Sequence, residues 1–328
     1  MEGLLSNLID PAILFFFLGL LIAAVRSNLE IPAAIQKFFS LYLLMAIGLK
    51  GGSSLAQTGF TTELGMVVLA AILLALVIPA YGYGILRRKY GRYDAAAIAA
   101  TYGSVSAVTF IAANSYLAAQ QIPFDGFMTV ALVVMESPAI VMAVYLAARA
   151  RQAESRTANN APTMSMKDVL HEAFTDGAHL LLLGSMLVGY LSGETGAAIM
   201  KPFTGDIFKG ILAFFLLEMG LLVARRLRES KSLSKFAVLF ALIFPLVNAG
   251  LGLGIAMLFQ LSLGNSILLM TLAASGSYIV VPAVIRYAIP EANPSLYFAM
   301  TLGITFPMNI VLGIPFYNYL ARQFIGGM

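Results

Sequence analysis

Residues 95–121 read AAAIAATYGSVSAVTFIAANSYLAAQQ, an apolar stretch long enough to cross a membrane that is interrupted by GSVS at 103–106. A second apolar stretch, residues 266–288, is interrupted in the same manner by SGSY at 275–278. Non-helical backbone is tolerated at membrane depth only where it is buried in protein or lines a cavity. Two such interruptions, at corresponding places in the two halves of a chain, are typical of the binding site of a secondary transporter. These stretches therefore predict a membrane protein with a central binding site.

The composition agrees with a membrane protein. The 328 residues are 60% hydrophobic and 11% charged, with a mean hydropathy of +0.88. The absence of Cys excludes disulfides and thiolate metal sites, and two His residues alone do not favour an imidazole site. The net charge of +4 fits membrane topology rather than nucleic-acid binding. Residues 1–10 hold no Lys or Arg, so we expect the first apolar stretch to be retained rather than removed as a signal peptide.

Ten segments have the length of a membrane span, about 17–25 mainly apolar residues. They are 11–25, 33–49, 64–86, 95–118, 127–148, 174–192, 207–224, 236–260, 266–288 and 296–320. The polar stretch near the middle predicts a linker at 151–168 between two five-span halves, 1–150 and 169–328. Because five is odd, the second half must be inverted relative to the first. The sequence thus predicts an all-α membrane protein, a 5+5 inverted repeat with broken helices in the fourth and ninth spans.

The basic residues predict the orientation. With the N-terminus outside, only Lys50, Lys201, Lys209 and Arg322 of the 20 Lys and Arg residues lie on the outer side. Such an excess of basic residues in cytoplasmic segments is the pattern of bacterial membrane proteins. Both termini are therefore expected outside the cytoplasm and the linker inside. Short matches in the same order support the repeat: AIGL at 46–49 with EMGL at 218–221, and ESP at 136–138 with TFP at 305–307.

The residues of the two interruptions are suited to binding a small anion. If the fourth span unwinds at Gly103, the next half-helix begins with free N–H groups and the positive end of a helix dipole. Such an end binds small anions, and the ninth span repeats the arrangement from the opposite side. Alternatively, Gly and Ser only allow helices to pack closely. The residues predicted to bind an anion such as bicarbonate are Gly103, Ser104, Val105, Ser106, Gly276, Ser277 and Tyr278.

Two acidic residues fall inside spans. A charged side chain at the bilayer centre costs at least about 2.5 kcal/mol, so Glu136 and Glu218 are candidate ligands for sodium or a proton. Each can instead be a neutral acid that is hydrogen-bonded to a neighbouring helix. Asn309 offers a carbonyl oxygen to a hard cation, or only satisfies a backbone that Pro307 interrupts. The chain has no Gly-x-Ser-x-Gly, HExxH or phosphate-binding glycine loop, so the sequence does not predict an enzyme.

Residues 273–294, AASGSYIVVPAVIRYAIPEANP, together with GSVSAVTF at 103–110, resemble the sodium-dependent bicarbonate transporters of cyanobacteria and their bacterial relatives. IGLKGG at 47–52 and AIPEANPS at 288–295 are the most specific matches, and the likeness extends over essentially the whole chain. The resemblance implies a trimeric symporter of the bacterial plasma (inner) membrane that couples bicarbonate uptake to sodium. It also implies a mobile core with crossing fourth and ninth spans, a gate built on the second and seventh spans, and a PII-like regulatory protein on the cytoplasmic face. By position the resemblance also implies sodium contacts at Thr109 and Ser275. Together with the acidic and amide candidates above, the residues predicted to bind sodium are Thr109, Ser275, Glu136 and Asn309.

The chain departs from the family pattern at the second interruption. Tyr278 stands where the family has an aspartate, Val280 and Val281 stand in place of Ser-Gly, and Val108 replaces a hydroxyl residue. These changes predict a weaker sodium site. They leave open a carrier of another small anion such as an organic acid, or coupling to protons through Glu136 or Glu218. A channel or a sensor is less favoured, because inverted repeats with broken helices suit alternating access.

Overall fold

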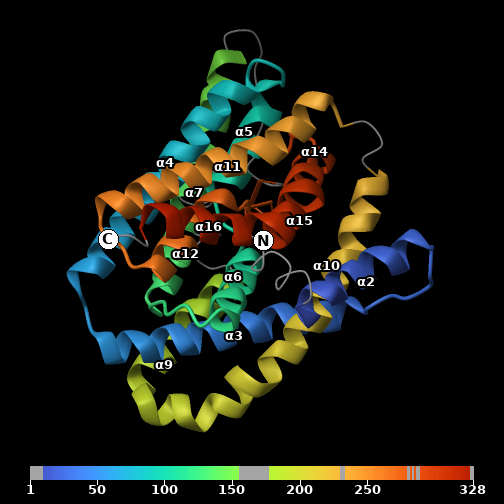
Figure 1. The fold of residues 1–328 in the computed structure, drawn as a ribbon. Helices are drawn as coiled ribbons and strands as arrows, with labels where there is room; N and C mark the ends of the chain where they lie inside the picture. Colours follow the sequence, from blue (N-terminus) through green and yellow to red (C-terminus); the bar gives the residue numbers. More distant parts are fainter. Residues whose placement is uncertain are drawn as a thin grey trace.

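The structure, a computed structural model, describes residues 10–154, 177–229, 233–278, 281–282, 284–285 and 289–325. These residues form helices and connecting segments, without a strand (Figure 1). The helices are α2 (Pro11–Ala24), α3 (Ala33–Thr58), α4 (Thr62–Leu86), α5 (Arg92–Gly103), α6 (Ala107–Ala119), α7 (Met128–Glu154), α9 (Gly177–Lys201), α10 (Ile207–Glu229), α11 (Lys235–Leu258), α12 (Leu263–Ala274), α14 (Pro294–Phe298), α15 (Phe306–Met308) and α16 (Ile314–Phe324), with π-helical turns η1 (Pro202–Asp206), η2 (Ala299–Thr305) and η3 (Asn309–Gly313).

The predicted all-α membrane architecture is confirmed at the level of its helices. Six helical segments in the described part of the chain have the length and apolar composition to cross a membrane, and α2 and α12 are shorter apolar helices. α7 continues to Glu154, so the first four residues of the predicted linker at 151–168 are helical. The rest of that linker, Val280 and both chain ends lie outside the described residues.

The predicted second span is shorter than the helix that the structure shows there. The second span was expected at 33–49, whereas α3 extends over Ala33–Thr58. Residues 51–54, GGSS, lower the local hydropathy, but in the structure they belong to a tightly packed helix. A Cβ atom on Gly52 would lie 1.9 Å from the Met186 carbonyl oxygen of α9, so only glycine allows this approach. Close packing of small residues is a main source of helix association in membranes.

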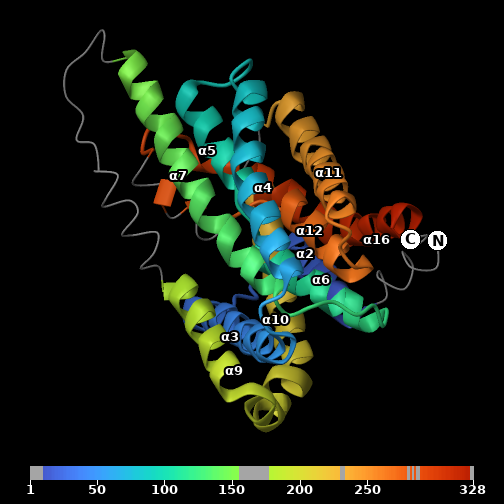
Figure 2. The ribbon, with the colours of Figure 1, turned by 90° about the vertical axis from the view of Figure 1, so that its left-hand side faces the viewer.

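The helices form two groups. In the first, α3 packs on α9 and α10 packs on α2. Figure 2 shows α3, α9 and α10 in the lower part of the molecule, and Figure 1 shows α10 next to α2. The second group contains α4 to α7 together with α11 and α12, and the segments from α14 to α16 pack with it. Glycine again sets the α10–α2 distance, because a Cβ atom on Gly220 would lie 2.2 Å from the Phe16 carbonyl oxygen. Each group therefore contains helices from both halves of the chain.

A proline connects three helices of the second group. Pro245 in α11 has no N–H group, so the carbonyl of Ala241, four residues earlier, loses its helical partner. The Thr305 hydroxyl in η2 donates to that carbonyl at 2.7 Å. The same hydroxyl lies 2.7 Å from the Tyr102 hydroxyl at the end of α5. The carbonyl that Pro245 leaves without a helical donor therefore joins α11 to η2 through Thr305. The bond between Thr305 and Tyr102 extends this connection to α5.

Candidate functional site between two helix breaks

The fourth predicted span consists of two helices. α5 ends at Gly103, and Ser104 is extended with φ −97° and ψ −173°. α6 starts after Ser106, whose Oγ accepts the Thr109 N–H at 3.1 Å and the Thr109 hydroxyl at 2.9 Å. We call residues 104–106 the first break. Gly103 is required by close contact, because a Cβ atom there would lie 2.6 Å from the Pro79 ring of α4.

The second break comprises residues 275–278, which follow the end of α12 at Ala274. The Asn309 amide donates to the Ala274 carbonyl at 2.9 Å and so satisfies an acceptor at the end of the helix. The Ser277 Oγ accepts the N–H of Val281 at 3.2 Å. Asn309 therefore supports the end of α12 rather than the backbone beside Pro307.

The two breaks are hydrogen-bonded to each other. The Ser106 N–H donates to the Ser275 Oγ at 3.0 Å, and the Ser277 N–H donates to the Thr101 carbonyl at 2.8 Å. Gly276 lies at this crossing, where a Cβ atom would be 3.1 Å from the Thr301 side chain. The structure thus brings together the two stretches that were predicted to hold an anion. It is tertiary hydrogen bonding, rather than local helix geometry, that fixes their backbones.

Several donors at the crossing have no acceptor among the residues that the structure describes. The Thr109 N–H is bonded to the Ser106 hydroxyl that caps α6. The N–H groups of Ala107 and Val108 belong to the first turn of α6 and have no acceptor within that helix. Among the described residues, the hydroxyls of Ser104 and Tyr278 are buried without a hydrogen-bond partner. Buried donors of this kind, beside the positive end of a helix, are suited to a small anion.

The four residues predicted to bind sodium lie at different places in the fold. Thr109 and Ser275 lie together at the crossing, because both are bonded to Ser106. Asn309 accepts the Tyr317 hydroxyl at 2.6 Å through its amide oxygen, which keeps a second lone pair. Glu136 is buried in α7, which packs on α4 and α5. The structure therefore brings Thr109 and Ser275 to the crossing and Asn309 to the end of α12 beside it, and the sodium roles of all four residues stay predictions.

Two cavities extend into the molecule. The Tyr278 cavity, of about 780 Å³, is lined by Tyr278 and Glu218, and by Lys37 and Arg226. The Arg226 guanidinium lies 5.3 Å from the centre of the Phe298 ring, which also lines this cavity. The positive-inside pattern assigns both basic residues to the cytoplasmic side. The Tyr278 cavity therefore leads from a basic entrance to the second break.

The Lys50 cavity, of about 460 Å³, is lined by Lys50 and Lys209, which the same pattern assigns to the outer side. The Lys50 ammonium lies 4.8 Å from the centre of the Phe208 ring. Asn114 and Ser115 of α6 also contribute to the wall. This cavity therefore reaches the later turns of α6, the half-helix that begins at the first break, whereas the Tyr278 cavity reaches the second break itself.

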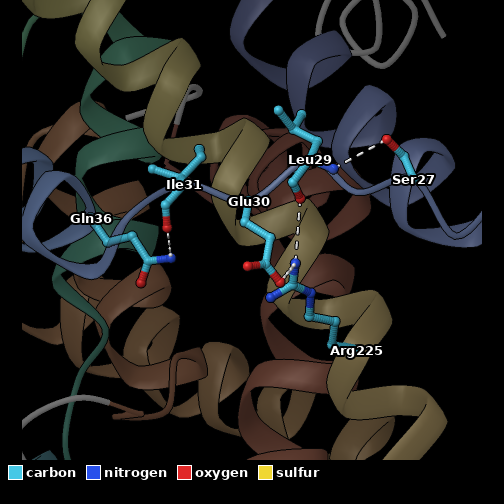
Figure 3. A network of polar contacts seen from close by, with 6 residues as sticks. All are labelled: Ser27, Leu29, Glu30, Ile31, Gln36 and Arg225. Atoms are coloured by element: carbon cyan, nitrogen blue, oxygen red, sulfur yellow. Dashed lines mark hydrogen bonds and ion pairs between the residues drawn. The ribbon is translucent and has the colours of Figure 1, made fainter.

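Polar contacts hold the connection between α2 and α3 in place (Figure 3). The Arg225 guanidinium of α10 lies 3.4 Å from the Leu29 carbonyl oxygen and 3.4 Å from a Glu30 carboxylate oxygen. The Gln36 amide, whose residue lines the Tyr278 cavity, donates to the Ile31 carbonyl at 2.8 Å. These contacts fix the start of α3 against α10 at the cavity entrance.

Comparison with known protein families matches residues 11–322 to the Na+-dependent bicarbonate transporter superfamily. The chain belongs to this superfamily. The matched range includes both breaks and every described helix except the last residues of α16. A sequence search of curated proteins finds no match. The resemblance inferred from residues 273–294 is thereby confirmed, and the protein is a multi-pass membrane transporter.

Membership of the superfamily does not by itself explain which residues complete the site. Sequence reasoning counted Lys37 and Arg226 only among the basic residues expected on the cytoplasmic side, whereas both line the cavity that reaches Tyr278. It also missed Thr101 and Thr305, which bond the breaks to each other and to α11. A signal for Thr305 existed, because a proline four residues after Ala241 leaves a carbonyl without a donor. No local signal pointed to Thr101, whose backbone carbonyl is the acceptor.

Proposed function

We propose that the protein is a secondary transporter that imports bicarbonate together with sodium and holds the anion between the two helix breaks. The observation that carries this proposal is the pair of hydrogen bonds that joins the breaks, Ser106 to Ser275 and Ser277 to Thr101. They present the unpaired donors of Ala107 and Val108 beside the buried hydroxyls of Ser104 and Tyr278. Preformed donors around a small volume bind an anion without the cost of ordering them.

The packing supports an inverted repeat with alternating access. Here the second span packs on the sixth and the seventh packs on the first, as α3 on α9 and α10 on α2. This is the relation that two inverted five-span halves produce. In the proposal, this group is the gate, and the group that contains both breaks is the core. Movement of the core against the gate, as in an elevator, opens the site alternately to the Tyr278 cavity and the Lys50 cavity.

Sodium is proposed near the anion. The superfamily's description names sodium dependence. Thr109 and Ser275 provide hydroxyl oxygens beside the anion donors, and Glu136 and Asn309 are further candidates. A cation here neutralises part of the anion's charge in a region of low dielectric, which explains why the two ions travel together. A homotrimer in the bacterial plasma membrane, both termini outside and a PII-like regulator at the cytoplasmic face complete the proposal.

The test is uptake of labelled bicarbonate into proteoliposomes with and without an inward sodium gradient. We expect accumulation that depends on the gradient and saturates with bicarbonate. The matched control is the same vesicles with potassium in place of sodium. Absence of sodium-driven uptake by protein that is shown to be folded contradicts the proposal.

One observation favours a second candidate function, transport of another small anion such as an organic acid. Tyr278 places a ring at the second break, where its edge meets Phe306 with ring centres 5.5 Å apart. A ring in this position changes the size and the hydrogen-bond donors of the site relative to the aspartate of the family. Competition for bicarbonate uptake by a series of small carboxylates decides between the two. A carboxylate that is itself accumulated, while bicarbonate is not, identifies the second function.

A further inference from the structure

Glu218 is a buried carboxyl group that the anion site does not use. It lies on α10 in the wall of the Tyr278 cavity and is 5% exposed. Its Oε2 atom is buried and has no hydrogen-bond partner among the described residues. An ionised carboxylate in such a place loses its hydration without gaining a partner, which is unfavourable at membrane depth. A bound proton removes the charge and turns one oxygen into a donor.

The carboxyl group faces the second break across the boundary between the two helix groups. Tyr278 and Glu218 line the same cavity and lie within range of electrostatic interaction. The Tyr278 hydroxyl points towards the Ser106 side chain, but it makes no hydrogen bond of normal geometry and remains buried and unpaired. Two unsatisfied groups thus meet where the core contacts the gate. The position of Glu218 relative to Tyr278 must change when the core moves against the gate.

The surroundings of Glu218 favour a proton over a metal ion. Lys37 of α3 and Arg226 of α10 line the same cavity, and Glu218 is its one acidic group among the described residues. α2, which packs on α10, has no charged residue, and neither has η2. The nearer wall is apolar: Phe215, Met219, Leu222, Phe298 and Leu302. A hard cation needs several oxygen ligands, whereas the described lining offers, besides Glu218, the hydroxyls of Ser40 and Tyr278 and the amide of Gln36. The two basic side chains of the same cavity repel a cation.

We propose that Glu218 is a proton-binding site of the gate whose protonation is linked to anion binding at the helix breaks. The linkage rests on the proposed transport of an anion. A charged Glu218 repels an anion beside Tyr278, and a protonated one does not, so each ligand strengthens the binding of the other. The transported anion is then accompanied by a proton in addition to sodium.

The first experiment measures the proton directly, without transport. Infrared difference spectra of the purified protein, taken across a pH titration, should show the C=O band of a protonated carboxylic acid that disappears as the pH rises. Glu218→Gln should remove that band, whereas Glu194→Gln, which changes an exposed carboxyl group of α9, should retain it. If Glu218→Gln does not fold, Glu218→Asp should retain the band at a shifted titration midpoint. A wild-type spectrum without a titrating band, or a band that survives Glu218→Gln, overturns the proposal.

The second experiment measures the linkage. Bicarbonate affinity of the wild-type protein, at fixed sodium between about pH 7 and 9, should fall by up to about tenfold per pH unit above the titration of Glu218. In Glu218→Gln it should change less than about twofold over that range. Affinity that is independent of pH in the wild type overturns the linkage, even if sodium-driven transport stands. A band that sodium displaces at constant pH assigns Glu218 to the sodium site and also overturns the proposal. If bicarbonate does not bind at all, the proposed function fails, and the infrared titration still decides whether Glu218 holds a proton.

Discussion

At the scale of the residue, Ser106 connects local and tertiary structure. Its hydroxyl accepts two hydrogen bonds from Thr109, so it caps α6 in the usual manner of serine. Its backbone N–H does not serve α6, because it donates to the hydroxyl of Ser275 in the other half of the chain. One residue therefore both starts a helix and joins the two breaks. Substitution of the Ser106 side chain removes the cap of α6 but keeps the backbone N–H that donates to Ser275.

The double substitution Ser106→Ala with Ser277→Ala should abolish measurable anion binding while the purified protein remains folded. It removes the hydroxyls that accept from Thr109 and Val281 but keeps the backbone bonds between the breaks. Loss of an N-cap costs about 1 kcal/mol, which leaves a folded protein. Isothermal titration with bicarbonate in sodium buffer measures the binding.

The matched control for the double substitution is Ser234→Ala. Ser234 caps α11 through the N–H of Ala237 and lies in neither break. It should lose comparable stability and retain the anion. Unchanged binding in the double variant would show that the breaks do not hold the anion.

Thr305→Val should lower the stability of the protein. The valine cannot donate to the Ala241 carbonyl, which Pro245 has already left without its helical donor. A buried acceptor without a partner costs about 1–3 kcal/mol. Thermal unfolding in detergent measures the effect, with Thr58→Val as control because Thr58 is exposed and bonds within its own helix. Equal midpoints for the two variants would contradict the role assigned to Thr305.

At the scale of the element, the end of α5 depends on contact with a neighbouring helix. Gly103 is the last residue of α5 and faces the Pro79 ring of α4. All three of the nearest atoms to a Cβ atom there belong to that ring, at 2.6–2.8 Å. The ring is rigid, so it cannot move aside as a flexible side chain can. The place where the fourth span stops is therefore decided by packing as well as by sequence.

Gly103→Ala should displace the first break and reduce both transport and thermal stability. Overpacking by one methyl group costs about 1–3 kcal/mol where the neighbours cannot relax. Gly84→Ala in α4 is the control, because a Cβ atom there meets nothing within 4 Å. That variant should be neutral or slightly more stable, since alanine is favoured over glycine in helices. Transport in Gly103→Ala at the level of the control would show that the break tolerates a side chain.

At the scale of the whole molecule, two cavities lie where the two groups of helices meet, because each is lined by residues of both groups. The Tyr278 cavity and the Lys50 cavity each carry basic residues in their walls; the first includes a residue of the second break, and the second reaches α6. An anion is attracted to such a cavity from either side of the membrane. The arrangement suits a site that is reached alternately from both sides.

Single-cysteine labelling tests the orientation of the cavities, since the chain has no native Cys. Ser40→Cys lies in the Tyr278 cavity and Ser115→Cys in the Lys50 cavity. A membrane-impermeant maleimide should label the first in inside-out vesicles and the second in right-side-out vesicles. Thr58→Cys, exposed at the end of α3, is the control for labelling from the outer side. The reverse pattern would overturn the predicted orientation with both termini outside.

The sequence by itself determined the class of protein, its all-helical character and the places where polar residues interrupt two apolar stretches. These features depend on local properties: the length of apolar runs, and glycine and hydroxyl residues within them. The same local measure failed for α3, because residues 51–54 look polar alone but pack against α9.

Only the tertiary structure decided which atoms meet. The bond from Ser277 to Thr101, the donation from Thr305 to Ala241 and the opposition of Glu218 to Tyr278 all join residues far apart in the chain. A sequence pattern shows which groups are polar and buried, but not which partner satisfies them. That choice follows from how the helices pack, because every buried polar group in the membrane must find its partner in another part of the fold.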